Sequence, residues 1–390
     1  MVNKDVEEHL IDMNDIVLSD YLAVLPICTN WKSSRLGTID CYEIFLKNDG
    51  SWNMVSHGYI QGTDPMWHEN TLYFSDLKHE YIMKDGNTPI VHDLKKEGLL
   101  QDAGSVYFND KFVSFYNWGY NEEDSQEEGE YSYEMVVVDK EKAARYILPF
   151  FLLADSLICH GHLVSLVETK VNGEEKDRSV YSFSLDGKYE KILEAKYPYI
   201  DGVKQKIGTE SHIFQCNNDS DVMGIAYVEN PSVEEDGRKN IDLMIEKWDL
   251  ERHEYSLIPL LEEDNEKFSI NDDYDYLEVL IVDDSTMYAQ LGMQGRIAKI
   301  DISTGKLHLL NEPLQTVDDQ GNYHYNVYSD YLHGKLYQFV EDPYREEDPY
   351  LRIVDVHTGK VLQKIEYKGL NKGIRSLSPF SLEVNPSVAK

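Results

Sequence analysis

The sequence predicts an all-β fold, a β-propeller of about seven four-stranded blades, and three observations lead to this prediction. A hairpin of two short β runs around a polar turn recurs along the 390 residues, and a second type of hairpin follows each copy. No segment carries a sustained apolar i, i+3, i+4 pattern with helix caps. Since one four-stranded sheet cannot bury both of its apolar faces alone, the sheets are expected to stack radially.

The first type of hairpin has aromatic and β-branched runs on either side of a polar turn. The steps at these turns include Asn-Asp, Asp-Asp and His-Gly, which favour hairpins. Seven copies are expected, at 16–24, 66–74, 106–113, 157–164, 213–221, 280–284 and 331–337.

The second type of hairpin closes on Gly or on a residue that tolerates positive φ. Its clearest copies lie at 299–307 and 353–361, and weaker ones lie at 45–52, 82–87, 137–142, 183–189 and 247–255. Each pair of hairpins makes one blade of about 52 residues, which is long for a propeller. We therefore expect a single domain over 1–390, with blades near 14–60, 61–100, 101–150, 151–200, 207–262, 273–315 and 323–370 and a closing strand in the tail 371–390.

The turns of the two clearest second hairpins share one motif, formed by Asp301, Thr304, Gly305 and Lys306 and by Asp355, Thr358, Gly359 and Lys360. This motif resembles the outer hairpins of seven-bladed propellers of the YVTN and quinoprotein-like superfamily. The resemblance implies the fold and says almost nothing about function. The Trp-rich docking repeats of quinoprotein dehydrogenases are absent, and Trp248-Asp249 is the single Trp-Asp ending of the WD40 kind. Neither a quinone cofactor nor WD40 membership is expected.

The composition excludes several classes of protein. Hydrophobic residues make up 42% of the chain, too many for a disordered protein. The longest apolar stretches, 146–154 and 277–282, are far shorter than the roughly 20 residues that span a bilayer. Lys and Arg number 37 against 71 Asp and Glu, and the net charge of -34 repels nucleic acid. Such a surface favours cationic partners or divalent cations, or serves solubility alone.

The four cysteines, Cys28, Cys41, Cys159 and Cys216, contain no C-x-x-C pair, which excludes a zinc ribbon or a thioredoxin-type motif. Each lies in an apolar strand-like context, so buried free thiols are expected. A Cys28–Cys41 disulfide is the alternative, because both residues fall in one blade. Residues 1–8 lack the apolar run of a signal peptide, so a cytoplasmic protein is expected. An extracellular or lipid-anchored protein whose leader had been removed would look the same.

Candidate site residues come from the loops that open on one face of a propeller. These are the loops that lead into each innermost strand and those that join the second and third strands. Converging carboxylates and imidazoles suit metal binding or acid–base work, whereas ordinary loop surface is the simpler interpretation. The predicted rim consists of Asp64, Asp102, Glu210, His212, Asp275, His324 and Arg375.

The same face receives acidic insertions, which a basic partner or a divalent cation would recognise, whereas flexible solvated loops are the simpler interpretation. They contain Glu122, Glu123, Asp124, Glu127, Glu128 and Glu130, then Glu174, Glu175 and Asp177, then Glu234, Glu235 and Asp236, and finally Glu346, Glu347 and Asp348. His160-Gly161-His162 is interpreted as a hairpin turn rather than as a metal chelate. Nucleophile-elbow, P-loop and dinucleotide motifs are missing from the sequence.

Two functions fit this pattern. The first is a non-catalytic binding or scaffold propeller whose acidic loop face binds a protein, a peptide or another ligand. The alternative is a hydrolase or lyase with a carboxylate and histidine cluster at the central channel, with or without a divalent cation. No other cofactor, no nucleic acid and no membrane span is expected, and the pattern does not bear on the oligomeric state.

Overall fold

The computed structural model describes most of the chain. The described residues are 7–29, 41–58, 65–95, 104–120, 131–171, 175–196, 199–200, 203–204, 207–209, 214–217, 221–228, 232–233, 239–271, 277–315, 324–342, 344, 346–373, 377–379 and 381–389. They form two compact units. Unit 1 comprises Met1–Pro149, Tyr325–Asp355 and Val361–Lys390, and unit 2 comprises Phe150–His324 and Val356–Lys360.

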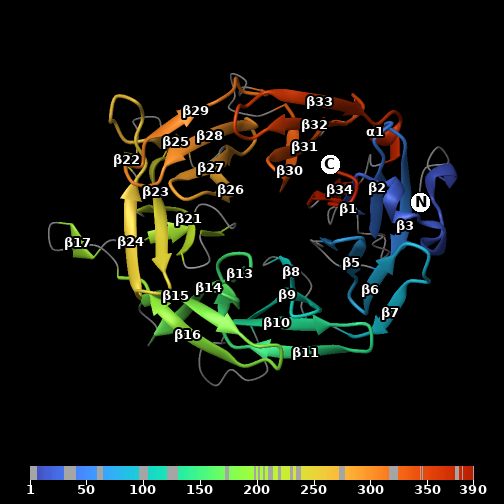
Figure 1. Cartoon of the computed structure of the whole chain (residues 1–390), viewed down its shortest axis with the longest axis horizontal. Helices are drawn as coiled ribbons and strands as arrows, with labels where there is room; N and C mark the ends of the chain where they lie inside the picture. Colours follow the sequence, from blue (N-terminus) through green and yellow to red (C-terminus); the bar gives the residue numbers. More distant parts are fainter. Residues whose placement is uncertain are drawn as a thin grey trace. The chain divides into compact units, whose positions relative to one another are not determined.

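Unit 1 holds four antiparallel sheets among its described residues, drawn in blue to teal and in red in Figure 1. We call them blades 1, 2, 3 and 7. Blade 1 contains β1 (Ala23–Thr29), β2 (Cys41–Leu46), β3 (Trp52–His57), β34 (Leu377–Pro379) and β35 (Glu383–Val384); blade 2 contains β4 (Met66–His68), β5 (Thr71–Ser75), β6 (His79–Lys84) and β7 (Ile90–Asp93); blade 3 contains β8 (Ser105–Phe108), β9 (Lys111–Tyr120), β10 (Tyr131–Val138) and β11 (Ala143–Leu148); blade 7 contains β30 (Asn326–Leu332), β31 (Lys335–Glu341), β32 (Tyr350–Asp355) and β33 (Val361–Glu366).

Unit 2 holds blades 4, 5 and 6, together with the small hairpin of β17 (Tyr199–Ile200) and β18 (Val203–Lys204). Blade 4 contains β12 (Phe151–Leu152), β13 (Leu157–Cys159), β14 (His162–Val171), β15 (Glu175–Phe183) and β16 (Tyr189–Glu194); blade 5 contains β19 (Ile207–Thr209), β20 (Gln215–Asn217), β21 (Asp221–Val228), β22 (Ser232–Val233), β23 (Lys239–Asp249), β24 (Glu254–Pro259) and β25 (Ser269–Asn271); blade 6 contains β26 (Leu277–Val282), β27 (Thr286–Leu291), β28 (Arg296–Asp301) and β29 (Leu307–Leu309).

These seven sheets confirm the predicted fold class, a seven-bladed β-propeller. Six of the seven predicted first hairpins form, as the β4–β5, β8–β9, β13–β14, β20–β21, β26–β27 and β30–β31 ladders. All seven second hairpins form as well. Within the described residues the single α-helix is α1 (Leu370–Gly373). None of the described helices has the length and apolarity that crossing a bilayer requires.

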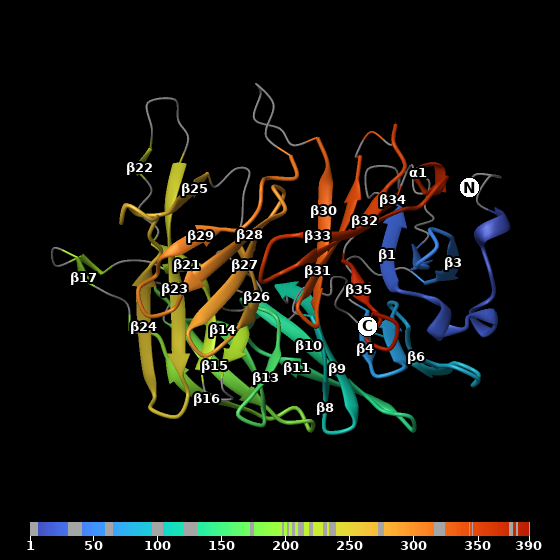
Figure 2. The same cartoon turned by 45° about the horizontal axis from the view of Figure 1, so that its top comes forward.

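The hairpin predicted at 16–24 is wrong. Leu18–Asp20 forms a 3-10 helix, and the side chain of Asp85 accepts hydrogen bonds from the backbone N–H groups of Leu18 and Ser19. The first strand of blade 1 comes instead from the tail, where the sequence suggested a closing strand. Figure 2 shows β34 and β35 against β1, and both pair with it in antiparallel register. Blade 1 is thus built from both ends of the chain.

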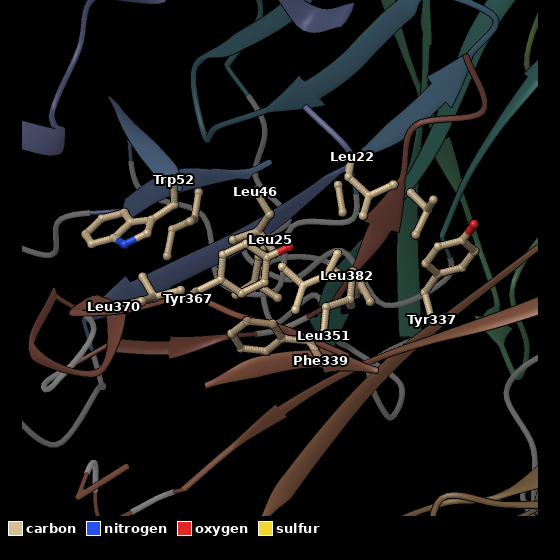
Figure 3. Close-up of a cluster of buried hydrophobic side chains, with 14 of the residues drawn as sticks. Leu22, Leu25, Leu46, Trp52, Tyr337, Phe339, Leu351, Tyr367, Leu370 and Leu382 are labelled. Atoms are coloured by element: carbon tan, nitrogen blue, oxygen red, sulfur yellow. The ribbon is translucent and has the colours of Figure 1, made fainter. Parts of the chain in front are cut away.

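Sheets that pack on both faces explain why the apolar alternation is imperfect. Every side chain of β2 is buried. Tyr42, Ile44 and Leu46 belong to an apolar cluster shared with blade 7, whereas Phe45 belongs to one shared with blade 2. In Figure 3 the labelled leucines of blade 1 lie against Phe339 and the other aromatic side chains of blade 7. Apolar clusters of the same kind lie between blades 2 and 3 in unit 1, and between blades 4 and 5 and blades 5 and 6 in unit 2.

The Asp-x-x-Thr-Gly-Lys turn of blade 6 requires its glycine. Gly305 has φ +71°, donates its N–H to the carbonyl oxygen of Asp301 at 2.8 Å, and leaves no room for a side chain, because a Cβ there would lie 1.9 Å from the carbonyl oxygen of Pro259. We expect Gly305→Ala to lower the free energy of unfolding by about 3 kcal/mol, since it adds a backbone clash to left-handed strain. Urea denaturation of the full chain measures this.

Gly86→Ala is the matched control for this prediction. Gly86 has nearly the same φ, +73°, but nothing lies within 4 Å of the position that a Cβ would occupy there. Gly86→Ala should therefore lower the free energy of unfolding only through left-handed backbone strain, by about 1 kcal/mol. If Gly305→Ala and Gly86→Ala lower the free energy of unfolding by the same amount, the close approach of Pro259 does not destabilise the Gly305→Ala variant.

Candidate functional site

One of the seven predicted rim residues lies among the described residues. His324 is exposed, at the start of the segment that leads into β30. The other six, Asp64, Asp102, Glu210, His212, Asp275 and Arg375, lie outside the described residues, so the convergence of the rim stays a prediction.

In blade 2, the two kinds of loop that were expected to share a face meet at Asp76. Asp76 lies in the β5–β6 turn and is 1% exposed. Its carboxylate accepts the N–H of Gly58 at 3.0 Å, from the segment that leads toward β4. It also accepts the N–H groups of Lys78 and His79, the His79 ring and the Tyr81 hydroxyl. Burial opposes ionisation of Asp76, but these hydrogen bonds outweigh it and lower the pKa of the carboxyl below 3.8.

Replacing Asp76 by asparagine is expected to lower the free energy of unfolding by about 2 kcal/mol at neutral pH, because hydrogen bonds to a carboxylate are strong. A folded-state pKa below the unfolded value means that the stabilisation is present above about pH 4 and is lost as the pH falls further. The difference between Asp76→Asn and the unsubstituted chain should therefore shrink in acid. Urea denaturation at neutral pH and near pH 3 measures it. A difference that does not change with pH would contradict an ionised Asp76.

In blade 7 the β31–β32 connection, which we call the blade 7 turn (342–349), is organised by a second buried carboxylate. Asp342 is 3% exposed. It accepts the N–H groups of Tyr344 and Glu346, each at 2.8 Å, and that of Glu347 at 3.3 Å. A carboxylate that accepts several N–H groups of one turn fixes the backbone of that turn. Asp342 therefore fixes the backbone of the turn at Tyr344, Glu346 and Glu347.

The exposed side chains of the blade 7 turn, among its described residues, are aromatic and acidic. Tyr344 is 75% exposed, the highest value among the large hydrophobic side chains of the described residues, and Glu346 and Glu347 are exposed beside it in the sequence. Tyr325, directly before β30, donates its hydroxyl to Glu347 at 3.1 Å. Burial and the nearby Glu347 raise the pKa of Tyr325, which keeps this donor protonated. As in blade 2, the segment leading into the first strand meets the connection between the second and third strands.

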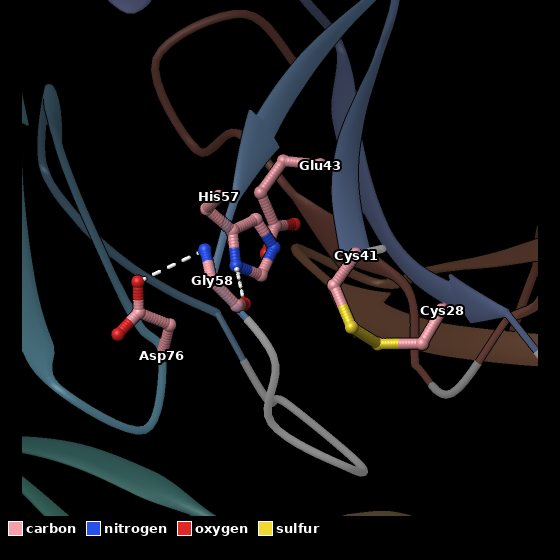
Figure 4. The surroundings of a disulfide bond; sticks show 6 residues. All are labelled: Cys28, Cys41, Glu43, His57, Gly58 and Asp76. Atoms are coloured by element: carbon pink, nitrogen blue, oxygen red, sulfur yellow. Dashed lines mark hydrogen bonds and ion pairs between the residues drawn. A yellow bond between two sulfur atoms is a disulfide. The ribbon is translucent and has the colours of Figure 1, made fainter. Parts of the chain in front are cut away.

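Blade 1 contains a buried acid–base pair on the face that is directed toward blade 2 (Figure 4). His57 and Glu43 have side chains that are 1% and 0% exposed, with Nε2 and Oε1 3.2 Å apart. Nδ1 of His57 donates to the carbonyl oxygen of Gly58 at 2.7 Å, because a carbonyl can only accept. Burial raises the pKa of Glu43, and His57 partly offsets this. Nδ1 of His57 is thus engaged by the backbone, and Nε2 lies beside the buried Glu43 carboxyl.

His160-Gly161-His162 forms the turn that the sequence predicted. His160 and Gly161 have φ of +53° and +68°, and β13 and β14 continue on either side. Across the described ranges, no three His, Cys, Asp or Glu side chains are grouped in a way that would hold a metal ion. A divalent cation at the rim involves residues outside those ranges and stays a prediction.

Glu346, Glu347 and Asp348 were predicted on the acidic face, whereas Asp342 and Tyr344 were not predicted. A local signal was present, since an Asp-Pro step directly after a strand is typical of turn initiation. Exposure of Tyr344 had no such signal, because most tyrosines of a β protein pack within its sheets. The other acidic insertions predicted for this face lie outside the described residues or have no described side chains.

The family model described as YycP, beta-propeller domain, matches residues 16–384. The comparison with curated proteins found no match.

Among solved structures, a variant of the apocarotenoid oxygenase of Synechocystis is 10% identical, with a TM-score of 0.47 over 90% of this chain and 91% of that one. Apo AztD from Citrobacter koseri is 10% identical, with a TM-score of 0.39 over 93% and 97%. The acylaminoacyl peptidase of Pyrococcus horikoshii is 13% identical, with a TM-score of 0.43 over 88% of this chain and 50% of that one. Similarity at this level bears on neither activity nor ligand.

Proposed function

The chain belongs to the YycP β-propeller domain family, and from this premise we propose that it is a non-catalytic binding propeller whose acidic loop face binds a basic protein or peptide. The single observation that carries the proposal is the blade 7 turn. It combines a fixed backbone with one exposed aromatic ring and two exposed carboxylates. Preorganisation of this kind lowers the entropy that a binding loop loses on contact.

The chemistry of the turn favours an arginine-rich or lysine-rich partner. An aromatic face attracts a guanidinium or ammonium group, and the carboxylates of Glu346 and Glu347 can pair with neighbouring cations. The net charge of -34 adds a long-range attraction that speeds the encounter with a basic partner. Arginine should bind better than lysine, because its planar group stacks on tyrosine and pairs with carboxylates in a bidentate manner.

Titration of the full chain with a fluorescent octa-arginine peptide tests the proposal, with octa-lysine as the second probe. We expect Glu346→Gln/Glu347→Gln to weaken octa-arginine binding about tenfold, the sum of two exposed ion pairs of about 0.7 kcal/mol each. Tyr344→Ala should weaken it about threefold and should narrow the preference for arginine over lysine.

Glu262→Gln/Glu263→Gln is the matched control, because it removes the same charge from another exposed position. If this pair lowers the affinity as much as Glu346→Gln/Glu347→Gln does, binding depends on net charge alone and the blade 7 turn is not the contact. If the chain catalyses hydrolysis or non-hydrolytic cleavage of a substrate, that result would instead support the alternative hypothesis of a hydrolase or lyase.

Kinship with the YVTN and quinoprotein-like propellers is part of this proposal. What supports it is that the Asp-x-x-Thr-Gly-Lys segment of blade 6 forms the β28–β29 turn. There Asp301 accepts hydrogen bonds from Ser303 and Thr304. The equivalent segment of blade 7 joins β32 to β33.

A further inference from the structure

All four cysteines are paired, which corrects the expectation of free thiols and agrees with the alternative kept for one pair. Cys28 and Cys41 lie directly opposite each other in the β1–β2 ladder, with Cα atoms 4.1 Å apart (Figure 4). Cys159 in β13 and Cys216 in β20 join the first-hairpin strands of blades 4 and 5 within unit 2, with Cα atoms 5.4 Å apart. The second pair had no signal in the sequence.

Both bridges have the surroundings of structural disulfides. Cys28, Cys41 and Cys159 are at most 2% exposed. Cys159 belongs to the apolar cluster between blades 4 and 5, with Val164 and Trp248. Structural disulfides form and persist in oxidising compartments and are rare where glutathione and thioredoxin keep thiols reduced.

We propose that this chain is a substrate of a disulfide-donating oxidoreductase in an oxidising compartment, and that this enzyme joins its cysteines in chain order without later isomerisation. This inference goes beyond the proposed binding function and favours the extracellular expectation over the cytoplasmic one. For each bridge, one cysteine thiolate attacks the disulfide of the oxidant and forms a mixed disulfide. The second cysteine thiolate then displaces the oxidant. The oxidant takes up two electrons and leaves as a dithiol, which carries the two protons that the cysteines lost.

Chain order is sufficient because each native bridge joins consecutive cysteines. Four cysteines allow three connectivities, and only one of them pairs first with second and third with fourth. Cys28 and Cys41 are 13 residues apart, whereas Cys41 is followed by a long cysteine-free stretch up to Cys159. Loop-closure entropy therefore favours Cys28–Cys41 over Cys41–Cys159 by roughly 30-fold in an unfolded chain. The Cys159–Cys216 pairing is favoured over Cys41–Cys159 by roughly threefold.

Burial sets the order of oxidation and folding. Three of the four cysteines are inaccessible in the folded units, so a protein-sized oxidant can reach them only before folding is complete. Oxidation during or before folding is therefore part of the proposal. The Cys159–Cys216 bridge then brings β13 and β20 together, and its sequence separation of 57 means that it removes more unfolded-state entropy than the shorter bridge does.

Two measurements on the full chain test the proposal. First, the protein is acid-quenched in its native cells, alkylated and mapped by mass spectrometry, and both native bridges with no alkylated cysteine are expected. Four alkylated cysteines would overturn it. Second, the reduced, denatured chain is diluted into oxidised glutathione without an isomerase. The two consecutive bridges should dominate the products.

Dominance of either non-consecutive connectivity in the second measurement would overturn the claim that no isomerisation is needed. Two paired variants serve as controls. Cys28→Ser/Cys41→Ser should still form Cys159–Cys216, and Cys159→Ser/Cys216→Ser should still form Cys28–Cys41. If a variant fails to refold, the bridge count of the unsubstituted chain still decides the outcome.

Discussion

Replacing Arg178 by methionine is expected to lower the free energy of unfolding by about 3–5 kcal/mol, because the change leaves a buried carboxylate without its counter-ion. Arg178 in β15 of blade 4 donates from Nη2 to Oε2 of Glu246 in β23 of blade 5, at 2.9 Å. The two side chains are 2% and 0% exposed. Tyr255 donates its hydroxyl to the other carboxylate oxygen at 3.0 Å. Burial raises the pKa of Glu246, and Arg178 opposes that effect by favouring the ionised form.

The controls separate a buried ion pair from an exposed one. Arg252→Met removes a guanidinium that is 75% exposed and 3.8 Å from Asp249, so it should cost less than about 1 kcal/mol. Arg178→Met/Glu246→Leu replaces both partners by apolar groups and should recover most of the loss. Equilibrium urea denaturation measures all three. If Arg178→Met and Arg252→Met lower the free energy of unfolding by the same amount, the buried Arg178–Glu246 ion pair does not stabilise unit 2 more than an exposed ion pair does.

Deleting residues 382–390 is expected to lower the free energy of unfolding by about 5 kcal/mol or more. This is a large part of the roughly 5–15 kcal/mol that is typical of a folded domain. Leu382, Val384 and Ala389 are each at most 3% exposed and pack into the cluster between blades 1 and 7. Burying an aliphatic side chain of this size stabilises by about 1.5–3 kcal/mol. Loss of the β35 pairing with β1 adds to this.

Asn385 carries the polar part of this closure. Its side-chain amide is buried and donates to the carbonyl oxygens of Leu18 at 3.0 Å and Tyr21 at 3.1 Å. Asn385→Ala should therefore lower the free energy of unfolding by about 2–3 kcal/mol, since both carbonyls lose a buried donor. Ser387→Ala is the matched control, because Ser387 is exposed and its hydroxyl donates one hydrogen bond, to the carbonyl oxygen of Glu69. A tail deletion that leaves the denaturation midpoint unchanged would contradict closure of blade 1 by both chain ends.

The sequence predicted the sheets well because hairpins are local. Runs such as 66–74 and 331–337 hold both strands and the turn within a few residues, so residue type is sufficient to predict the pairing. The failure at 16–24 is not local. Its Ser-Asp step looks like a hairpin turn, but Asp85 satisfies the N–H groups of Leu18 and Ser19, and the tail supplies the first strand of blade 1.

Side-chain partners across blades were beyond sequence reasoning for the same reason. Cys159 and Cys216 are 57 residues apart, and Arg178 and Glu246 are 68 residues apart. No pattern within one blade records which face of the neighbouring blade it meets. In the candidate site, the acidic residues of the blade 7 turn could be predicted, because a run of charged residues can be recognised directly in the sequence. The buried Asp342 that shapes the turn became evident only from its three N–H donors.

The salt dependence of octa-arginine binding tests the proposed function most directly. Binding through Tyr344, Glu346 and Glu347 predicts that the dissociation constant rises steeply as the ionic strength increases from about 0.05 to 0.5 M, since exposed charges are screened. It also predicts a shallower dependence for Glu346→Gln/Glu347→Gln than for Glu262→Gln/Glu263→Gln. An affinity that does not change with salt, or identical slopes for the two pairs, would contradict recognition of a basic partner at the blade 7 turn.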